Sequence, residues 1–307
     1  MTERTSAAAT LLARFRRQRP LRGGSLIITV FGDAIAPRGG AITLGSLIQL
    51  MADFGLPERL VRTSVARLAA DDWLASRRVG RRSEYRLSAS GRQRFVEATR
   101  RIYGGPVTGW PGRWTLVLMP GVDATRRQRI RETLRWEGFG ELESGLLAHP
   151  TLTPAEAREH LTLAGLPDAP VILESHAFGP LADRRLVERG WDLRELAARY
   201  GRFIKSFAPV LLALASRERP RPASAFVVRT LLIHEYRRIH LRDPLLPPAL
   251  LPSDWPGTAA YESCRSIYER VLPAAEEHVT ALAARLDGAL PAPGAELYQR
   301  FTGLLRP

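Results

Sequence analysis

The sequence predicts an α+β protein, and three observations support this class. Apolar residues recur at helical spacing towards both ends of the chain. Short β-branched runs alternate with helical patterns in the middle of the chain, and one alternating segment lies near residue 85. The composition is that of a globular protein, with 45% hydrophobic and 25% charged residues among 307. A chain of this length accommodates two or three domains of ordinary size.

The N-terminal region predicts three helices. The apolar run from Ser25 to Ile35 is typical of a buried helix, although its β-branched residues also permit a strand. Thr43 is a favourable N-cap for a second helix, which Gly55 ends. Its apolar positions are Leu44, Leu47, Ile48, Met51 and Phe54. Pro57 suits the start of a third helix that runs to about Asp71, and so short a connection is typical of a helix-turn-helix.

The third helix has one apolar face and one basic face. The inward positions are Val61, Val65, Leu68 and Ala69. The opposite face carries small residues and arginines, which suit close approach to bases and phosphates in a DNA groove. The candidates for base-edge and nearby phosphate contacts are Arg59, Arg62, Thr63 and Arg67. A solvated helix surface would show the same pattern, so the helix alone does not decide its role.

The segment after the third helix predicts a β-hairpin with a basic tip. Gly80 separates two short strands, and Tyr85 and Leu87 alternate with polar residues in the second strand. Four arginines surround the turn: Arg77, Arg78, Arg81 and Arg82. We expect them to contact the DNA backbone and so to position the protein on the duplex. Ser88 is a favourable cap for a further helix that ends at Gly104, with Phe95, Val96 and Ile102 as its apolar members. Three helices, a hairpin and a helix, in this order, predict a winged helix-turn-helix domain.

Charge supports a nucleic-acid partner for this region. The formal net charge of the chain is +14, and residues 1–104 hold 19 of the 45 basic residues but only 8 of the 31 acidic ones. Such an asymmetry is typical of a module that binds a polyanion. A genomic preference for arginine codons explains why Lys205 is the sole lysine, but it does not explain the asymmetry.

The middle of the chain predicts a small α/β domain of the ferredoxin-like class. We expect strands over 113–119, 142–148 and 170–175, separated by helices over 123–137 and from Pro154 onwards. The remaining residues predict helices and no further strand. These helices cover 193–200, 203–216 with a kink at Pro209, 223–238 and 259–286. The predicted domains are a basic N-terminal arm at 1–22, the winged helix at 23–104, the ferredoxin-like domain at 105–184 and a helical effector and dimerisation domain at 185–307.

Signals of catalysis, metal binding and membrane insertion are absent from the sequence. His234-Glu235 does not continue into a zinc motif, because Arg238 stands where the second histidine is required. The single cysteine, Cys264, excludes an internal disulfide, and no apolar stretch is long enough for a membrane span. We therefore expect a cytoplasmic protein that is not an enzyme and has no cofactor. The alternatives are a metal-dependent nuclease using Asp123, which is more typical of a helix N-cap, and an RNA-binding factor using the central domain.

A polar stretch interrupts the apolar C-terminal helices. Residues 233–243 contain two carboxylates, several basic side chains and a tyrosine. They are compatible with a structural ion network between two helices or with a site for a phosphorylated ligand, and the sequence leaves both open.

Several segments, in this order along the chain, resemble the PaaX family of bacterial repressors of phenylacetic-acid degradation. In the N-terminal region these are 28–33 (ITVFGD), 37–40 (PRGG), 44–48 (LGSLI), 61–68 (VRTSVARL) and 80–83 (GRRS). In the C-terminal region they are 233–238 (IHEYRR), 241–244 (LRDP), 250–252 (LLP) and 255–257 (WPG). The arginine-rich extension before Gly23 is not part of this pattern.

The resemblance implies a homodimeric repressor that binds double-stranded operator DNA and is released by an acyl-CoA, usually phenylacetyl-CoA. We predict that such an aryl-CoA binds between the central and C-terminal domains. Its phosphates would meet Arg237, Arg238 or Arg242, and its acyl ring would lie near Trp255. Side chains that would orient these arginines are His234, Glu235 and Asp243. The opposing interpretation is that the same residues only join the C-terminal helices.

Overall fold

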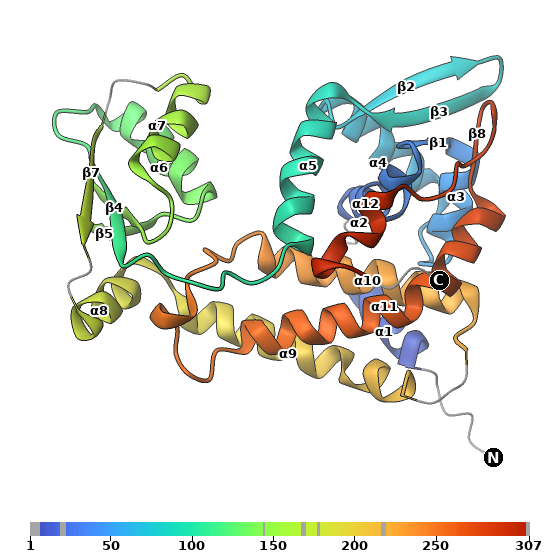
Figure 1. Cartoon of the computed structure of the whole chain (residues 1–307). Coiled ribbons are helices and arrows are strands. Elements are labelled where there is room, and N and C mark those ends of the chain that lie inside the picture. Colours follow the sequence, from blue (N-terminus) through green and yellow to red (C-terminus); the bar gives the residue numbers. More distant parts are fainter. Residues whose placement is uncertain are drawn as a thin grey trace. The chain divides into compact units, whose positions relative to one another are not determined.

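The computed structural model describes residues 7–18, 23–143, 145–166, 170–176, 179–215 and 219–304. The chain forms two compact units (Figure 1). Unit 1 comprises 1–105, 202–241 and 259–307, and unit 2 comprises 106–201 and 242–258. The structure mixes helices and small sheets, which confirms the α+β class. Within the described residues, no helix is both long and apolar enough to span a membrane.

The predicted N-terminal helices are present in unit 1. Helix α2 (Gly23–Val30) continues into a π-helical turn, η1 (Phe31–Ile35), and a short 3-10 turn, η2 (Ala36–Arg38), so the apolar run is helical and not a strand. Helix α3 (Leu44–Ala52) begins where predicted, because the Thr43 side chain accepts a hydrogen bond from the Ser46 amide. Helix α4 (Glu58–Ala70) follows after a short turn.

A three-stranded antiparallel sheet follows α4. Strands β2 (Leu74–Val79) and β3 (Arg82–Leu87) form the predicted hairpin. Strand β1 (Ala41–Thr43), which the sequence did not predict, pairs with the other side of β3. Helix α5 (Ala89–Tyr103) begins at its predicted cap, Ser88. The sheet therefore joins the hairpin to the residues that precede α3.

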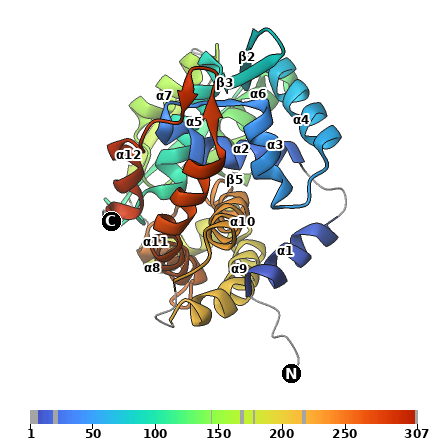
Figure 2. The same cartoon turned by 90° about the vertical axis from the view of Figure 1, so that its right-hand side faces the viewer.

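The long C-terminal helices pack in the same unit as the N-terminal elements. Most residues of helix α10 (Pro222–His240) are buried, and this helix contacts α1, α2 and α5 (Figure 2). Helix α1 (Ala7–Arg17), in the predicted basic arm, buries Leu11 and Phe15. Helix α11 (Pro256–Leu282) continues through Pro273 without a break. The unit thus combines elements from both ends of the sequence.

Unit 2 contains an antiparallel sheet in the order β5-β6-β4-β7. Its elements are β4 (Arg113–Leu118), α6 (Ala124–Trp136), β5 (Gly140–Glu143), β6 (Leu146–His149), α7 (Pro154–Leu163) and β7 (Val171–His176). The prediction of a single strand over 142–148 was wrong, because Gly145 adopts a φ of +88° in a turn between two strands. The elements therefore follow a βαββαβ order.

Apolar residues cover both faces of the unit 2 sheet. Val117 and Leu147 lie in one core with Ile130 and Leu134 of α6 and Leu161 of α7. The second core contains other sheet residues, namely Trp114, Leu142 and Ala148. They pack against Val187 of helix α8 (Pro180–Gly190), against Leu246, and against Leu250 of the 3-10 turn η3 (Pro248–Leu250). A capping box is present at the start of α7, since Thr153 and Glu156 exchange hydrogen bonds.

Three details of the helical and C-terminal predictions were wrong. Residues 193–213 form one helix, α9 (Leu193–Ala213), and not the two predicted helices, and Pro209 lies inside it. Two short strands, β8 (Ala284–Arg285) and β9 (Gly288–Ala289), form a hairpin after α11, before α12 (Ala295–Tyr298) and η4 (Arg300–Thr302). Val96, predicted as an apolar helix member, is 71% exposed.

Candidate nucleic-acid interface

Helix α4 separates its residues into a buried and an exposed face, as its spacing predicted. Val61 and Val65 are fully buried and Leu68 nearly so, and the helix packs against α2 and α3. The four candidate DNA-contact residues on the other side of α4 are all exposed: Arg59, Arg62, Thr63 and Arg67. The buried face determines the rotation of α4 about its axis, and this rotation directs the arginines to the surface.

The exposed arginines of α4 are only lightly engaged by other side chains. Arg62 forms an ion pair with Glu58 one turn earlier, at 2.7 Å, and both side chains are more than half exposed. The Thr63 hydroxyl donates to the Arg59 carbonyl oxygen. The guanidinium groups of Arg59 and Arg67 have no hydrogen-bond or ionic partner among the described residues. An exposed ion pair contributes little to stability, so these side chains remain available to a ligand.

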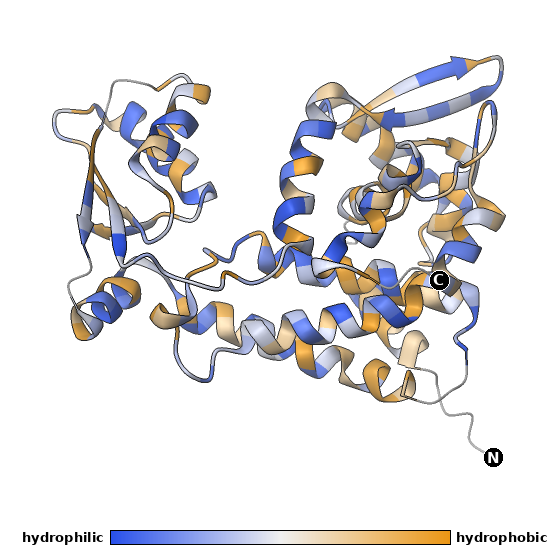
Figure 3. Ribbon diagram, in the orientation of Figure 1, coloured by the Kyte–Doolittle hydropathy of each residue, from blue (hydrophilic) through white to orange (hydrophobic). Residues whose placement is uncertain are grey.

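Hairpin β2–β3 presents the second group of arginines. Arg77, Arg78, Arg81 and Arg82 are all exposed, and Figure 3 shows the hydrophilic character of the hairpin. Val79 pairs with Arg82, which leaves a two-residue turn with Gly80 first at a φ of +58°. This position of a two-residue hairpin turn favours glycine, because residues with a Cβ adopt positive φ only at a cost.

The turn between α3 and α4 is held by elements from both ends of the sequence. The Asp53 carboxylate accepts a hydrogen bond of 2.7 Å from the His278 Nε2 of α11. Arg16 of α1 donates to the carbonyl oxygen of Phe54 at 3.1 Å. Phe15 and Phe226 of α10 also contact the Phe54 ring edge to face. The orientation of α4 therefore depends on α1, α10 and α11 as well as on its sequence neighbours.

A buried ion network joins the N-terminal elements to the C-terminal helices. We use this name for Asp33, Arg38, Arg229, Glu276 and Arg300. The Asp33 carboxylate lies 2.7 Å from the Nε of Arg229 and 2.9 Å from Arg300, and all three side chains are at most 3% exposed. Glu276 pairs with both Arg38 and Arg229. Each buried charge thus has an opposite charge beside it, as burial requires.

Two tyrosines add hydrogen bonds to this network. The hydroxyls of Tyr103 in α5 and Tyr268 in α11 donate to Oδ1 of Asp33 at 2.6 and 2.8 Å. Burial raises the pKa of both tyrosines well above the usual value, with the negative charge of Asp33 adding to the effect. Burial alone would lower the pKa of Arg229, but Asp33 raises it, so the guanidinium stays charged. The network therefore ties η1, α5, α10 and α11 together.

The predicted effector residues on α10 have protein partners. Arg237 donates from Nε to the Thr29 hydroxyl at 2.9 Å and from Nη2 to the Ser25 carbonyl and hydroxyl oxygens at 2.8 Å. Its burial lowers the pKa of Arg237 to about 10. His234 is 1% exposed, with Nδ1 3.1 Å from the same Thr29 hydroxyl. These contacts attach α10 to α2, which is the structural role that the sequence left open.

The other predicted effector residues lie in different surroundings. Glu235 accepts from the Gln18 side-chain amide at 3.2 Å and forms an ion pair with Arg238. Arg242, Asp243 and Trp255 belong to unit 2. There Asp243 accepts from the Tyr200 hydroxyl at 2.6 Å, and Trp255 meets the Tyr200 ring edge to face, while Arg242 is exposed. Their binding to an acyl-CoA stays a prediction.

Asp123 acts as a helix cap, as its position predicted. Its carboxylate accepts a hydrogen bond of 2.9 Å from the Arg126 amide at the start of α6. The described part of the chain contains no group of three or more His, Cys, Asp or Glu residues placed to hold a metal ion.

Three family models match successive parts of this chain. Residues 22–91 match "PaaX-like protein", 107–187 match "PaaX protein central Cas2-like domain" and 191–281 match "PaaX-like protein C-terminal domain". The chain is also 41% identical over 289 residues to the Transcriptional repressor PaaX of Escherichia coli (strain K12), which covers 93% of this chain and 92% of that protein. The chain belongs to the PaaX family.

Structural likeness extends the comparison beyond sequence. The Uncharacterized protein Rv0674 from Mycobacterium tuberculosis matches with a TM-score of 0.51 at 22% identity, over 89% of this chain and 99% of that chain. At this identity the likeness concerns the fold alone. The family models and the identity to the curated repressor confirm the predicted membership of the PaaX family.

The buried ion network of this PaaX family member was not predicted from the sequence. A signal was present, because Asp33 lies at the end of an apolar run and Arg229 interrupts the apolar run of α10. A charged residue within an apolar segment predicts a buried ion pair. The sequence contains no signal, however, that identifies the partner of either residue.

Proposed function

We propose that this PaaX family member is a transcriptional repressor that binds double-stranded operator DNA through a winged helix-turn-helix. Helix α4 would enter the major groove, and hairpin β2–β3 would be the wing. The observation that carries the proposal is that all eight predicted contact residues of α4 and the hairpin are exposed, while the opposite face of α4 is buried. The 41% identity to a curated repressor supports the same function.

The two groups of contact residues would have different roles. On α4, Arg59, Arg62, Thr63 and Arg67 would read base edges and nearby phosphates, since arginine forks match the acceptors of guanine. On the wing, Arg77, Arg78, Arg81 and Arg82 would bind backbone phosphates and position the domain. Affinity would fall steeply with salt because each phosphate contact releases a counterion.

We further propose a cytoplasmic homodimer whose inducer is an aryl-CoA thioester such as phenylacetyl-CoA. Family membership supports this proposal, and the βαββαβ order of unit 2 supports a ferredoxin-like central domain. Among the predicted effector residues, Arg242 is exposed and is the best candidate for the phosphates. His234 and Arg237 would instead keep α10 attached to α2.

The test of DNA recognition is selection of bound duplexes from a random-sequence library, followed by affinity measurements on the recovered duplex. We expect Arg62→Ala and Arg67→Ala each to weaken binding by about 1–3 kcal/mol and to relax the preference at one base pair. Arg135→Ala is a matched control, because Arg135 is 60% exposed and paired with Glu141 in unit 2, much as Arg62 is paired with Glu58.

Two outcomes would refute the proposal. One is normal binding of the recovered duplex by both α4 variants. The other is recovery of no preferred duplex together with tight binding of structured RNA, whose deep, narrow major groove does not admit a helix.

A further inference from the structure

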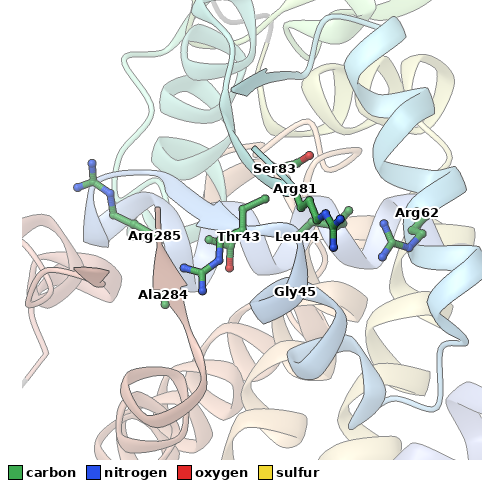
Figure 4. A pocket seen from close by; sticks show the side chains of 9 residues that line it. Thr43, Leu44, Gly45, Arg62, Arg81, Ser83, Ala284 and Arg285 are labelled. Atoms are coloured by element: carbon green, nitrogen blue, oxygen red, sulfur yellow. The ribbon is translucent and has the colours of Figure 1, made fainter. Parts of the chain in front are cut away.

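An arginine-lined cleft lies beside the proposed DNA-reading helix. The cleft has a volume of about 420 Å³ and is bordered by the start of α3, by α4, by the tip of hairpin β2–β3 and by hairpin β8–β9. Its arginines are Arg62, Arg81, Arg82 and Arg285, and Figure 4 shows these elements around the cleft. We call this site the arginine cleft. It combines residues of the proposed interface with a residue from the C-terminal end of the chain.

The charges around the arginine cleft are not balanced. Arg62 is paired with Glu58, and Arg285 lies 3.0 Å from Asp287. Arg81 and Arg82, by contrast, have no ionic or hydrogen-bond partner within the described ranges. The Nε of Arg285 is buried and makes no hydrogen bond within them. Four arginines that border one cleft favour an anion, and guanidinium groups match phosphate oxygens in geometry. The Arg285 side chain points away from those of Arg62 and Arg81 in Figure 4.

Hydrogen bonds hold the C-terminal hairpin against the N-terminal elements. The amide of Leu286 donates to the buried carboxylate of Glu84 in β3 at 2.9 Å. The amide of Ala284 donates to the Ser46 hydroxyl in α3 at 3.0 Å. Strand β8 also contacts β1. Arg285 is thus attached to the same elements that carry the proposed interface, and its position does not depend on an exposed loop.

We infer that the arginine cleft binds a backbone phosphate of duplex DNA, so that hairpin β8–β9 is part of the DNA interface. This inference rests on the proposed function, because the DNA would approach α4 and the wing, which supply the other arginines of the cleft. It extends that function to a segment beyond residue 281, where the match to the C-terminal family model ends. A phosphate contact contributes to affinity and register but reads no sequence.

The test measures DNA affinity against salt for the wild type, Arg285→Ala and Arg265→Ala. Arg265 is the matched control, because it also has an acidic neighbour at 3.0 Å and its side chain is 35% exposed, compared with 31% for Arg285. The probes are a duplex recovered by selection and a mixed-sequence duplex of the same length. Anisotropy between about 50 and 300 mM KCl gives the slope of log K against log salt, whose magnitude decreases by about 0.9 for each phosphate that the protein no longer binds.

We expect Arg285→Ala to reduce the magnitude of the slope by about 0.9 and to weaken binding of both duplexes by the same factor. Arg265→Ala should match the wild type, and thermal melts should show that both variants are folded. Equal slopes for all three proteins would overturn the inference and leave the proposed function intact. Absence of a preference for the selected duplex in the wild type would refute the proposed function instead.

A second arm distinguishes a DNA phosphate from a small phosphorylated ligand. Pyrophosphate and free coenzyme A are added to the wild type and to Arg285→Ala without DNA, and the melting temperature is measured. We expect no difference between the two proteins in the shift. If either compound stabilises only the wild type while both proteins bind DNA equally, the cleft is a small-anion site and the inference is overturned.

Discussion

Replacement of Asp33 by asparagine tests the buried ion network most directly. The asparagine side chain would keep the shape of the aspartate but would remove the negative charge beside Arg229 and Arg300. Arg229 would retain Glu276, whereas Arg300 would lose its only carboxylate partner among the described residues. The perturbation therefore leaves a buried guanidinium without an opposite charge.

The expected loss of stability is large. Breaking a buried ion pair by removal of one partner costs about 3–5 kcal/mol, because the remaining charge stays desolvated. For a cooperative unit of this size, about 2–4 °C of melting temperature are lost per kcal/mol, which predicts a decrease of roughly 6–20 °C. The exposed pair of Glu58 and Arg62 provides the comparison, since Glu58→Gln should cost less than about 0.5 kcal/mol.

The assay is urea and thermal denaturation followed by far-ultraviolet circular dichroism, because α10 and α11 contribute much of the helical signal. A double variant with Arg300→Met completes a thermodynamic cycle. We expect it to be more stable than Asp33→Asn alone, because the uncompensated cation is removed together with its partner. A loss below about 1 kcal/mol for Asp33→Asn, or additive losses in the double variant, would refute the reasoning.

Two further predictions follow from buried titratable groups. Burial raises the pKa of the Cys264 thiol, so Ellman's reagent should react with it only after denaturation, and immediate stoichiometric reaction of the native protein would contradict this burial. Tyr103 and Tyr268 have raised pKa values in the folded state, so they should not ionise near pH 10 when absorbance at 295 nm is followed. The folded state then retains protons that the unfolded state releases, so the contribution of these two tyrosines to stability should be constant below pH 10 and should fall as the pH rises above it. Ionisation of all seven tyrosines near pH 10 with unchanged circular dichroism would be the contrary result.

Local signals in the sequence predicted the proposed DNA-binding elements well. Thr43 and Ser88 begin helices where their side chains were expected to cap them. Gly80 was predicted at a hairpin turn and occupies one. Caps and tight turns depend on hydrogen bonds and backbone angles within a few residues, so a short stretch of sequence contains the whole interaction.

Predictions failed where a local pattern had more than one solution. Residues 142–148 contain enough apolar residues for one strand, and only the pairing of β5 with β6 makes them a hairpin. Pro209 is usually a helix breaker, yet α9 continues through it. Val96 has helical spacing, but its side chain is 71% exposed on α5. In each case packing decided between conformations that the local sequence permits.

The sequence by itself determined the amphipathic face of α4, the basic hairpin and the family, because each of these features depends only on contiguous or regularly spaced residues. Only the tertiary structure decided that α10, α11 and hairpin β8–β9 pack with the N-terminal elements. It also decided that Asp33 meets Arg229 and Arg300, which lie 196 and 267 positions away. A buried charge requires an opposite charge beside it, but many arginines in this chain could satisfy that requirement, and the packing of the helices selects which of them does.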